Sequence, residues 1–513
     1  MPPQEEVSLL PKEEAAEPPR REEPTAWLLV LGSLATVLFG ASGTSLPRML
    51  QGAEEGKHWY RKQLSLLVTI HITSGCVLGL VGRHLAPQIR SALREAKAAD
   101  EGNAPSVVEH RWDTLKWTLT MLVSLTHFTD VFEYFVWRQI YGTFKEFFLM
   151  ETYMFVSGYL STPVATSRRL RAIWKSVAGA YFVNQLLFLT LVKIAYKWGP
   201  VGRLDQTFKD YSSKEAAEIN MFEYFWYPFS ILYYLADLIM ARIAAPTWME
   251  LRYPLVMSFV LAVCVQYGGS SGFFALTEFF AFFPYYILGI TVKKHARQFA
   301  QFLEWKGTRV GLALGFMLMF VVTIVSYGLK NELGLNSVLE HTGWFDAMEG
   351  KEGFDFKSDY SGKTLWFAWY DNVGGIPLRF LMIAAAISLF GGGSDPVVFK
   401  LPFGGFELDI TQQGKNSMAN YILHYYLKFL LAFTPLFLPS HYGIPKILLI
   451  CFIVFVQANF WMWPPVQRFL KPIFLAPNMD FLLAPPEDLP SRQHQQQHQQ
   501  HQQKGVVVAS KKP

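Results

Sequence analysis

One predicted helix carries several residues that could act together in a reaction at membrane depth. The segment reads Asp113-Thr-Leu-Lys116 and continues, after ten further residues, to His127. On an ideal helix the Lys116 and His127 side chains are separated by about 20° around the axis and by about 16 Å along it. Thr120 and Ser124 fall between them on nearly the same face. Because polar groups are costly inside a bilayer, this polar stripe indicates a lined site rather than a surface in contact with lipid.

The residue types of this stripe could move a proton and hold a charged ligand. A histidine can act as a general base, and the charge of a lysine can bind an anionic group. Spacing alone also allows Lys116 to be an interfacial anchor. It equally allows His127 to be a structural residue whose hydrogen-bond partner lies on a neighbouring helix.

The elements that must position these residues are predicted to be membrane-spanning helices. Of the 513 residues, 51% are hydrophobic and 17% are charged, whereas soluble domains carry about 25% charged residues. A helix needs about 20 apolar residues to cross the hydrocarbon core. Uncharged windows of this length cover residues 26–47, 63–82, 253–277, 310–329 and 447–467.

We predict an all-α integral membrane protein of about twelve transmembrane helices. Their centres lie near residues 36, 72, 126, 157, 184, 233, 260, 283, 319, 384, 427 and 457. Arg168 to Arg171 follow the fourth span and Lys293 to Arg297 follow the eighth, so both basic loops lie on the side of the two termini. The positive-inside rule makes that side cytosolic, and the acidic loop 330–363 then faces the lumen or exterior. The expected location is the plasma membrane or an endomembrane.

The prediction divides the chain into five segments. These are a cytosolic tail at 1–24, two helices at 25–82, a polar linker at 83–111, a ten-helix core at 112–470 and a Pro-, Gln- and His-rich tail at 471–513. The tails cannot bury apolar surface and are predicted to be disordered.

Composition also excludes some partners. The net charge of +5, without a basic stripe, excludes a nucleic-acid partner. The three cysteines, Cys76, Cys264 and Cys451, have spacings that fit neither a zinc site nor a disulfide framework. We predict that they are packed core residues, and no metal site is predicted.

Five short segments follow one another along the ten-helix core. They are Asp113 to Lys116 with His127, Met154 to Leu160, Tyr233 to Leu238, Phe282 to Gly289, and Gly414 to Ser417 with Tyr421 and His424. In residue types, in order and in the spans that carry them, they resemble the acyltransferase-3 family, especially its fucose 4-O-acetylase-like branch. The first two helices and both tails lie outside the resemblance.

The resemblance implies a membrane O-acyltransferase. Such an enzyme moves an acyl group, commonly acetyl, from acyl-coenzyme A as donor substrate to a hydroxyl, commonly of a carbohydrate, with no bound cofactor. On this resemblance His127 is the base that takes the hydroxyl proton, which is worth about 10²–10⁴-fold. Asp130, three residues on, either orients its ring or lies at the membrane interface. The charge of Lys116 suits a phosphate of coenzyme A, and Asp113 is placed to orient Lys116.

His424 and Asn416 are further candidates, for substrate binding, although His424 can equally be a helix-packing residue. Ser157 and Gly158 are expected to allow close helix packing rather than to act as a nucleophile.

Three positions depart from the family pattern. Lys116 takes a place often held by arginine, which keeps the charge but loses the bidentate fork. Tyr233 replaces the usual tryptophan. Glu278 stands where an arginine is expected, so we predict that it lies in the acceptor pocket; a structural ion pair with Lys428 or Arg379 is the alternative.

Two other classes of protein remain open. A twelve-span secondary transporter could be coupled to protons through buried ionisable groups, namely His127, Glu151, Asp237 and Glu278. A non-catalytic family member that binds lipid or another membrane protein is the second alternative. His71 lies outside the matched core and is predicted to be structural.

Overall fold

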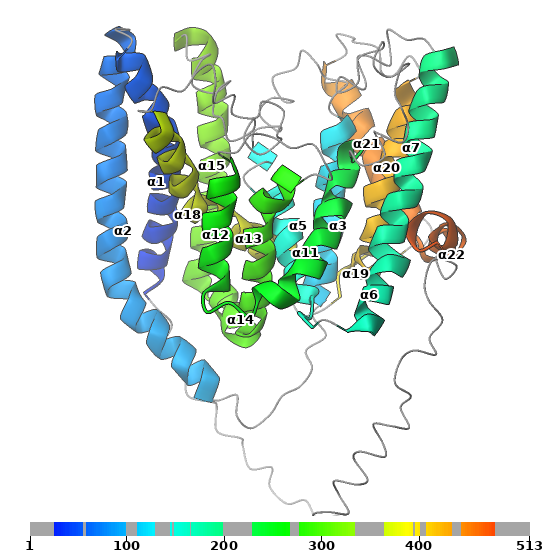
Figure 1. Ribbon diagram of the computed structural model, residues 1–513. Coiled ribbons are helices and arrows are strands. Elements are labelled where there is room, and N and C mark those ends of the chain that lie inside the picture. Colours follow the sequence, from blue (N-terminus) through cyan, green and yellow to red (C-terminus); the bar gives the residue numbers. More distant parts are fainter. Residues whose placement is uncertain are drawn as a thin grey trace, which may run out of the picture.

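The structure is a computed structural model in which most of the described residues are helical (Figure 1). It describes residues 25–54, 58–98, 110–128, 144–145, 148–164, 166–198, 228–266, 276–333, 364–392, 396–400, 407–432 and 443–477. Asp130 and most of the predicted acidic loop 330–363 lie outside these ranges.

Twelve helices contain the twelve predicted span centres. They are α1 (Ala26–Glu54), α2 (His58–Ala98), α3 (His110–Phe128), α5 (Leu149–Leu160), α7 (Gly179–Trp198), α11 (Tyr233–Trp248), α12 (Pro254–Gln266), α13 (Leu276–Lys293), α15 (Lys306–Leu333), α18 (Thr364–Phe390), α20 (Ser417–Ala432) and α21 (Gly443–Met462). Shorter helical elements are α6 (Ser167–Ile173), η2 (Trp174–Ala178), η3 (Ser230–Leu232), α14 (Ala296–Glu304), α19 (Ile410–Gly414), α22 (Pro464–Leu470) and η6 (Lys471–Leu475). Strands β1 (Val398–Lys400) and β2 (Glu407–Asp409) pair antiparallel.

Several helices are able to cross a membrane. Among the described residues, three are long and apolar enough by themselves, over Ser65–Ala92, Ser167–Ile194 and Lys306–Ile324. A fourth span is possible if the pair Ile447–Met462 and Pro464–Leu475, bent by 67°, counts as one. Length and apolarity therefore identify three or four spans.

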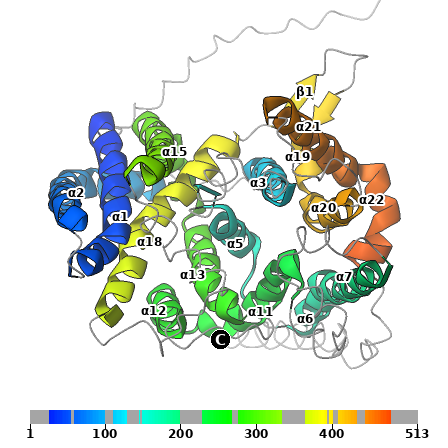
Figure 2. The ribbon, with the colours of Figure 1, turned by 90° about the horizontal axis from the view of Figure 1, so that it is seen from above.

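The helices run side by side as a bundle (Figure 1). Viewed along the bundle, α3 and α5 lie near its middle, α1 and α2 at one edge, and α7 and α22 at the opposite edge (Figure 2). The main hydrophobic core is built largely from α3, α5, α11, α13, α18 and α20. The residues singled out for chemistry thus lie mainly on the inner helices.

Two glycines allow α5 and α13 to pack closely at the centre of the bundle. A Cβ at Gly158 would overlap the carbonyl oxygen of Tyr286, and one at Gly289 would overlap that of Phe155. Two of the five family-like segments therefore meet at a small-residue contact of the type common between membrane helices. The predicted packing role of Gly158 is confirmed.

The first two helices pack against the outside of this core. Ser42 on α1 lies 3.0 Å from Nδ1 of His71 on α2, and the His71 ring stacks on Phe39 at 4.2 Å. Gly307 and Gly311 of α15 allow α1 to approach closely. The structural role predicted for His71 is confirmed.

Helical structure extends into two segments that were predicted to be polar linker or tail. Helix α2 continues to Ala98, across the first half of the predicted linker 83–111, because Leu85, Ile89 and Ala92 form an apolar stripe that packs with Trp305. At the other end, η6 continues past residue 470 to Leu475.

The prediction for the cysteines was wrong. Cys76, Cys264 and Cys451 are all exposed on the outer surface of the helices rather than packed in the core. The apolar sequence around each cysteine indicates only that the residue is removed from water. Apolarity does not distinguish contact with a neighbouring helix from contact with lipid.

Candidate functional site

The first and last family-like segments lie against each other along most of their length. Helix α3 packs on α19 and α20, and a Cβ at Gly414 would overlap the backbone of Asp113. One step further along, the hydroxyls of Thr114 and Thr411 lie 3.1 Å apart. We call this contact between α3 and α19–α20 the polar seam, from Asp113 at one end to His127 at the other.

The middle of the polar seam is fully buried. The Nδ2 of Asn420 donates to Ser124 Oγ at 2.9 Å and to the Thr120 carbonyl oxygen at 3.3 Å. The Thr120 hydroxyl is also hydrogen-bonded to that of Tyr153 on α5. Thr120, Ser124 and Asn420 are each 0% exposed. The predicted polar stripe of α3 therefore faces other helices and not lipid.

The two predicted histidines meet at one end of the seam. The rings of His127 and His424 are tilted by 31° with centroids 5.2 Å apart. The ring of Tyr425 lies edge-on to His127 at 5.3 Å. His424 is completely buried, and its Nδ1 lies 2.8 Å from the carbonyl oxygen of Asn420. This hydrogen bond lies within helix α20.

The other end of the seam carries an ion pair. Lys116 Nζ lies 2.8 Å from Asp113 Oδ1, and the two side chains are 21% and 18% exposed. Asp113 is therefore close enough to orient Lys116, as the role predicted for it requires. Because both groups remain partly accessible, the ammonium can still meet a ligand from outside the bundle.

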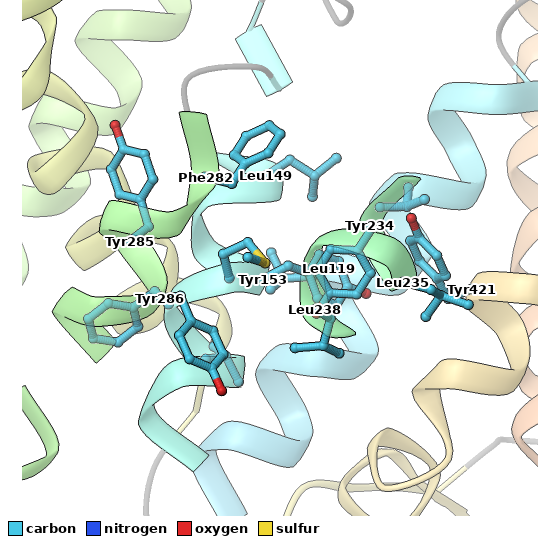
Figure 3. Close-up of a cluster of buried hydrophobic side chains, with 14 of the residues drawn as sticks. Leu119, Leu149, Tyr153, Tyr234, Leu235, Leu238, Phe282, Tyr285, Tyr286 and Tyr421 are labelled. Atoms are coloured by element: carbon cyan, nitrogen blue, oxygen red, sulfur yellow. The ribbon is translucent and has the colours of Figure 1, made fainter. Parts of the chain in front are cut away.

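Three tyrosines pack beside the buried seam (Figure 3). Tyr153 of α5, Tyr234 of α11 and Tyr421 of α20 have ring centroids 5.2 to 6.1 Å apart. The Tyr234 hydroxyl also bonds Ser157 Oγ at 2.7 Å. Sequence reasoning did not single out these tyrosines. All three lie in or next to family-like segments, which was the available signal.

Sequence reasoning also missed the buried side-chain amides of Asn420 and Gln457. Gln457 Nε2 donates to Asn420 Oδ1 at 3.0 Å, and Trp461 Nε1 donates to Gln457 Oε1 at 2.9 Å. Both amides lie in apolar spans. The argument that marked His127, that a polar group at membrane depth needs a reason, applies to them equally.

Basic residues from two distant loops gather at the Lys116 end of the bundle. Arg169 Nη2 donates to Ser161 Oγ at 2.6 Å, and Lys293 Nζ donates to the Ser161 carbonyl oxygen at 3.0 Å. The preceding turn is held to the start of α3 by Tyr159, whose ring lies 4.2 Å from that of Trp112. The basic loops after the predicted fourth and eighth spans therefore lie at the same end as Lys116.

The two remaining candidates, Asn416 and Glu278, lie at the starts of other contacts between helices. Asn416 Nδ2 donates to the Met462 carbonyl oxygen at 3.1 Å and so joins α20 to the end of α21. Glu278 lies in the first turn of α13, and α13 packs on α11, which carries Asp237. Asp237 is 0% exposed, and neither of its carboxylate oxygens has a hydrogen-bond partner among the described residues.

The two basic residues considered as partners of Glu278 have other contacts. Arg379 Nη1 lies 3.5 Å from Glu151 Oε1 and 3.3 Å from the Tyr285 hydroxyl. The Lys428 ammonium lies 5.1 Å from the centroid of the Tyr425 ring. A buried ion pair thus joins α5 to α18, which sequence reasoning did not predict.

The arrangement can hold a charged group at one end of the seam and move a proton at the other. Within the described ranges, no group of three or more His, Cys, Asp or Glu side chains could hold a metal ion. No family model, curated protein or solved structure matches the chain.

Proposed function

We propose that the protein is a membrane-embedded O-acyltransferase. It moves an acyl group from acyl-coenzyme A to a hydroxyl, and the family resemblance favours acetyl as the group and a carbohydrate as the acceptor. The observation that carries the proposal is the polar seam, in which two segments from opposite ends of the predicted core place an ion-paired lysine at one end and two histidines at the other.

The spacing along α3 suits a long donor. Lys116 and His127 are separated by about 16 Å along the helix, so one small ligand cannot touch both. Coenzyme A carries its phosphates at one end and its thioester at the end of an extended pantetheine arm. Its phosphates would lie by Lys116 and the basic side chains around Ser161, with its thioester toward His127.

The proposed reaction needs one proton acceptor at the thioester. The acceptor hydroxyl attacks the thioester carbonyl carbon while His127 takes its proton. The bond from carbon to sulfur then breaks, and the departing thiolate takes up the proton that His127 holds. The products are the O-acyl ester and free coenzyme A.

The proposed topology has twelve spans with both termini in the cytosol. It is supported by the helices at all twelve predicted centres and by the meeting of Arg169 and Lys293 at Ser161. Donor then enters from the cytosolic end of the bundle, and the membrane is an endomembrane or the plasma membrane.

Release of free coenzyme A tests the proposal. Purified protein is mixed with acetyl-coenzyme A and candidate sugar acceptors, and the free thiol is followed with a chromogenic reagent. We expect acceptor-dependent release that His127→Ala abolishes and His71→Ala preserves, because His71 is a buried histidine outside the seam. Absence of release with every acceptor, or full activity of His127→Ala, would contradict the proposal.

A proton-coupled transporter is the second candidate, and Asp237 is the observation that favours it. A buried carboxyl group that has no hydrogen-bond partner among the residues the structure describes suits a residue that carries a proton. Proteoliposomes with a pH-sensitive dye inside distinguish the two. Proton uptake driven by a solute gradient, lost in Asp237→Asn, supports transport, and an acyltransferase shows none.

A further inference from the structure

The side chains of Asn420, Gln457 and Trp461 form an amide network beside the seam. The donor and acceptor of each hydrogen bond in this network can be assigned. The Trp461 indole can only donate, so the Gln457 atom that faces it is the acceptor Oε1. Gln457 Nε2 therefore donates to Asn420 Oδ1. The Asn420 Nδ2 then faces the carbonyl oxygen of Thr120, which can only accept. The orientation of Asn420, the residue one turn before His424, is thus set by three mutually consistent contacts.

His424 has one nitrogen whose proton is assigned by its partner and one nitrogen without a partner. Nδ1 lies 2.8 Å from the Asn420 carbonyl oxygen, so Nδ1 must carry the hydrogen. In the neutral ring Nε2 then holds a lone pair. This atom is buried and has no hydrogen-bond partner among the described residues. A buried acceptor without a donor costs about 1–3 kcal/mol, so a donor is expected beside it.

His127 is the neighbouring ring at the distance that such a donor requires. An N–H···N hydrogen bond of about 3 Å between two imidazoles puts their centroids about 5 Å apart. The observed separation is 5.2 Å. The χ2 torsion of a histidine is soft, so rotation of the His127 ring can turn one N–H group toward Nε2 of His424.

We infer that His424 is a positioning residue that fixes the tautomer of His127. Its Nε2 accepts the N–H of one His127 nitrogen and leaves the other nitrogen bare, facing the acceptor hydroxyl. This inference rests on the proposed function. A carboxylate has this role beside the histidine of a Ser-His-Asp triad. The sequence analysis offered Asp130 for this role, with the membrane interface as its alternative position, and Asp130 lies outside the described residues.

The same contact serves the proton transfer itself. When His127, which is partly buried, takes the hydroxyl proton it becomes a cation with little access to water, and this is costly without an acceptor. The lone pair of His424 supplies that acceptor without adding a second charge. Its own Nδ1–H remains bonded to the Asn420 carbonyl oxygen, so the relay runs from the backbone through two imidazoles to the substrate.

Selective ¹⁵N labelling of histidine tests the tautomer independently of activity. The His127 signals are identified by their loss in His127→Gln. In His424→Phe, which keeps a ring but lacks the lone pair, we expect these signals to change from one tautomer to a mixture. We also expect kcat to fall by roughly 10- to 100-fold with the donor KM unchanged, which is less than the loss in His127→Ala.

The control variant is His71→Phe, because His71 is also buried between helices but lies outside the seam. It should leave both the His127 signals and kcat unchanged. His424→Leu is a second variant, smaller than phenylalanine and equally without an acceptor, for use if the larger ring prevents folding.

The outcomes separate this inference from the proposed function. Unchanged His127 signals in folded His424→Phe or His424→Leu would overturn the positioning role, whatever the activity. A changed tautomer in protein that releases no coenzyme A with any acceptor would support the positioning role and remove the acyltransferase proposal.

Discussion

The rings of His127 and His424 lie 5.2 Å apart, centroid to centroid, although one residue belongs to the third predicted span and the other to the eleventh. Helix α20 brings its histidine to α3 because Gly414 lets the backbones approach at one end and Asn420 bonds across to α3 in the middle. The pair is therefore held by contacts distributed along the whole seam. Five predictions follow from this arrangement and from the helices around it.

Loss of the Lys116 charge should weaken donor binding. A hydrogen bond to a charged group is worth about 1.5–3 kcal/mol, so Lys116→Ala should bind acetyl-coenzyme A roughly 10- to 100-fold less tightly. Lys116→Arg should bind it nearly as well as the wild type, because the charge is kept. Isothermal titration calorimetry in detergent measures both. If Lys116→Ala binds the donor normally, Lys116 is only an anchor at the membrane interface. The donor then enters the protein at another place.

Glu278→Gln should change the use of the acceptor more than that of the donor. The substitution removes one charge from the first turn of α13, which packs on α11 and its buried Asp237. We expect a changed acceptor KM or acceptor preference, with donor KM unchanged, from initial rates at varied concentrations of each. A fall in donor affinity alone would show that Glu278 does not lie in the acceptor pocket.

Membrane topology can be read from glycosylation of engineered acceptor sites. A site introduced near residue 336 should be modified in cells, because the acidic loop 330–363 is proposed to face the lumen. A site near residue 168 should remain unmodified on the cytosolic side. A gel shift with and without glycosidase gives the result. The reverse pattern would overturn both the orientation and the cytosolic entry of the donor.

Gly158→Ala should destabilise the bundle. The added Cβ would overlap the backbone of Tyr286, which cannot move without separating α5 from α13. Overpacking of this kind costs about 1–3 kcal/mol. Gly79→Ala on α2 is the matched control, since a Cβ there meets nothing within 4 Å. Fluorescence-detected thermal unfolding in detergent should show a lower Tm for Gly158→Ala only.

Removal of one partner from the buried pair of Glu151 and Arg379 should lower the stability of the folded protein. The side chains are 2% and 8% exposed, so Arg379→Met leaves a buried carboxylate and should cost about 3–5 kcal/mol. The double variant Glu151→Gln with Arg379→Met should regain much of that stability. Thermal unfolding of the single and double variants measures the coupling. Additive losses would show that the two groups do not act as a pair.

The sequence by itself determined where the helices lie and which face of α3 is polar. Uncharged windows mark the helices because crossing or packing in an apolar environment excludes charge from a continuous run of residues. The polar stripe from Lys116 to His127 follows from helix periodicity, which is a local property. The close packing of Gly158 and the pairing of Asp113 with Lys116 were predictable for the same reason, because short segments specify them.

Only the tertiary structure decided which helices face one another. The windows around Cys76, Cys264 and Cys451 are as apolar as buried ones, yet these residues are exposed on the outer surface. The pairing of His424 with His127, the amide network at Asn420 and the buried contact of Glu151 with Arg379 each join segments far apart in the chain. Hydropathy and periodicity describe one segment at a time. The partner of each polar group is instead fixed by how small residues let the backbones approach and by which donors and acceptors then come within reach.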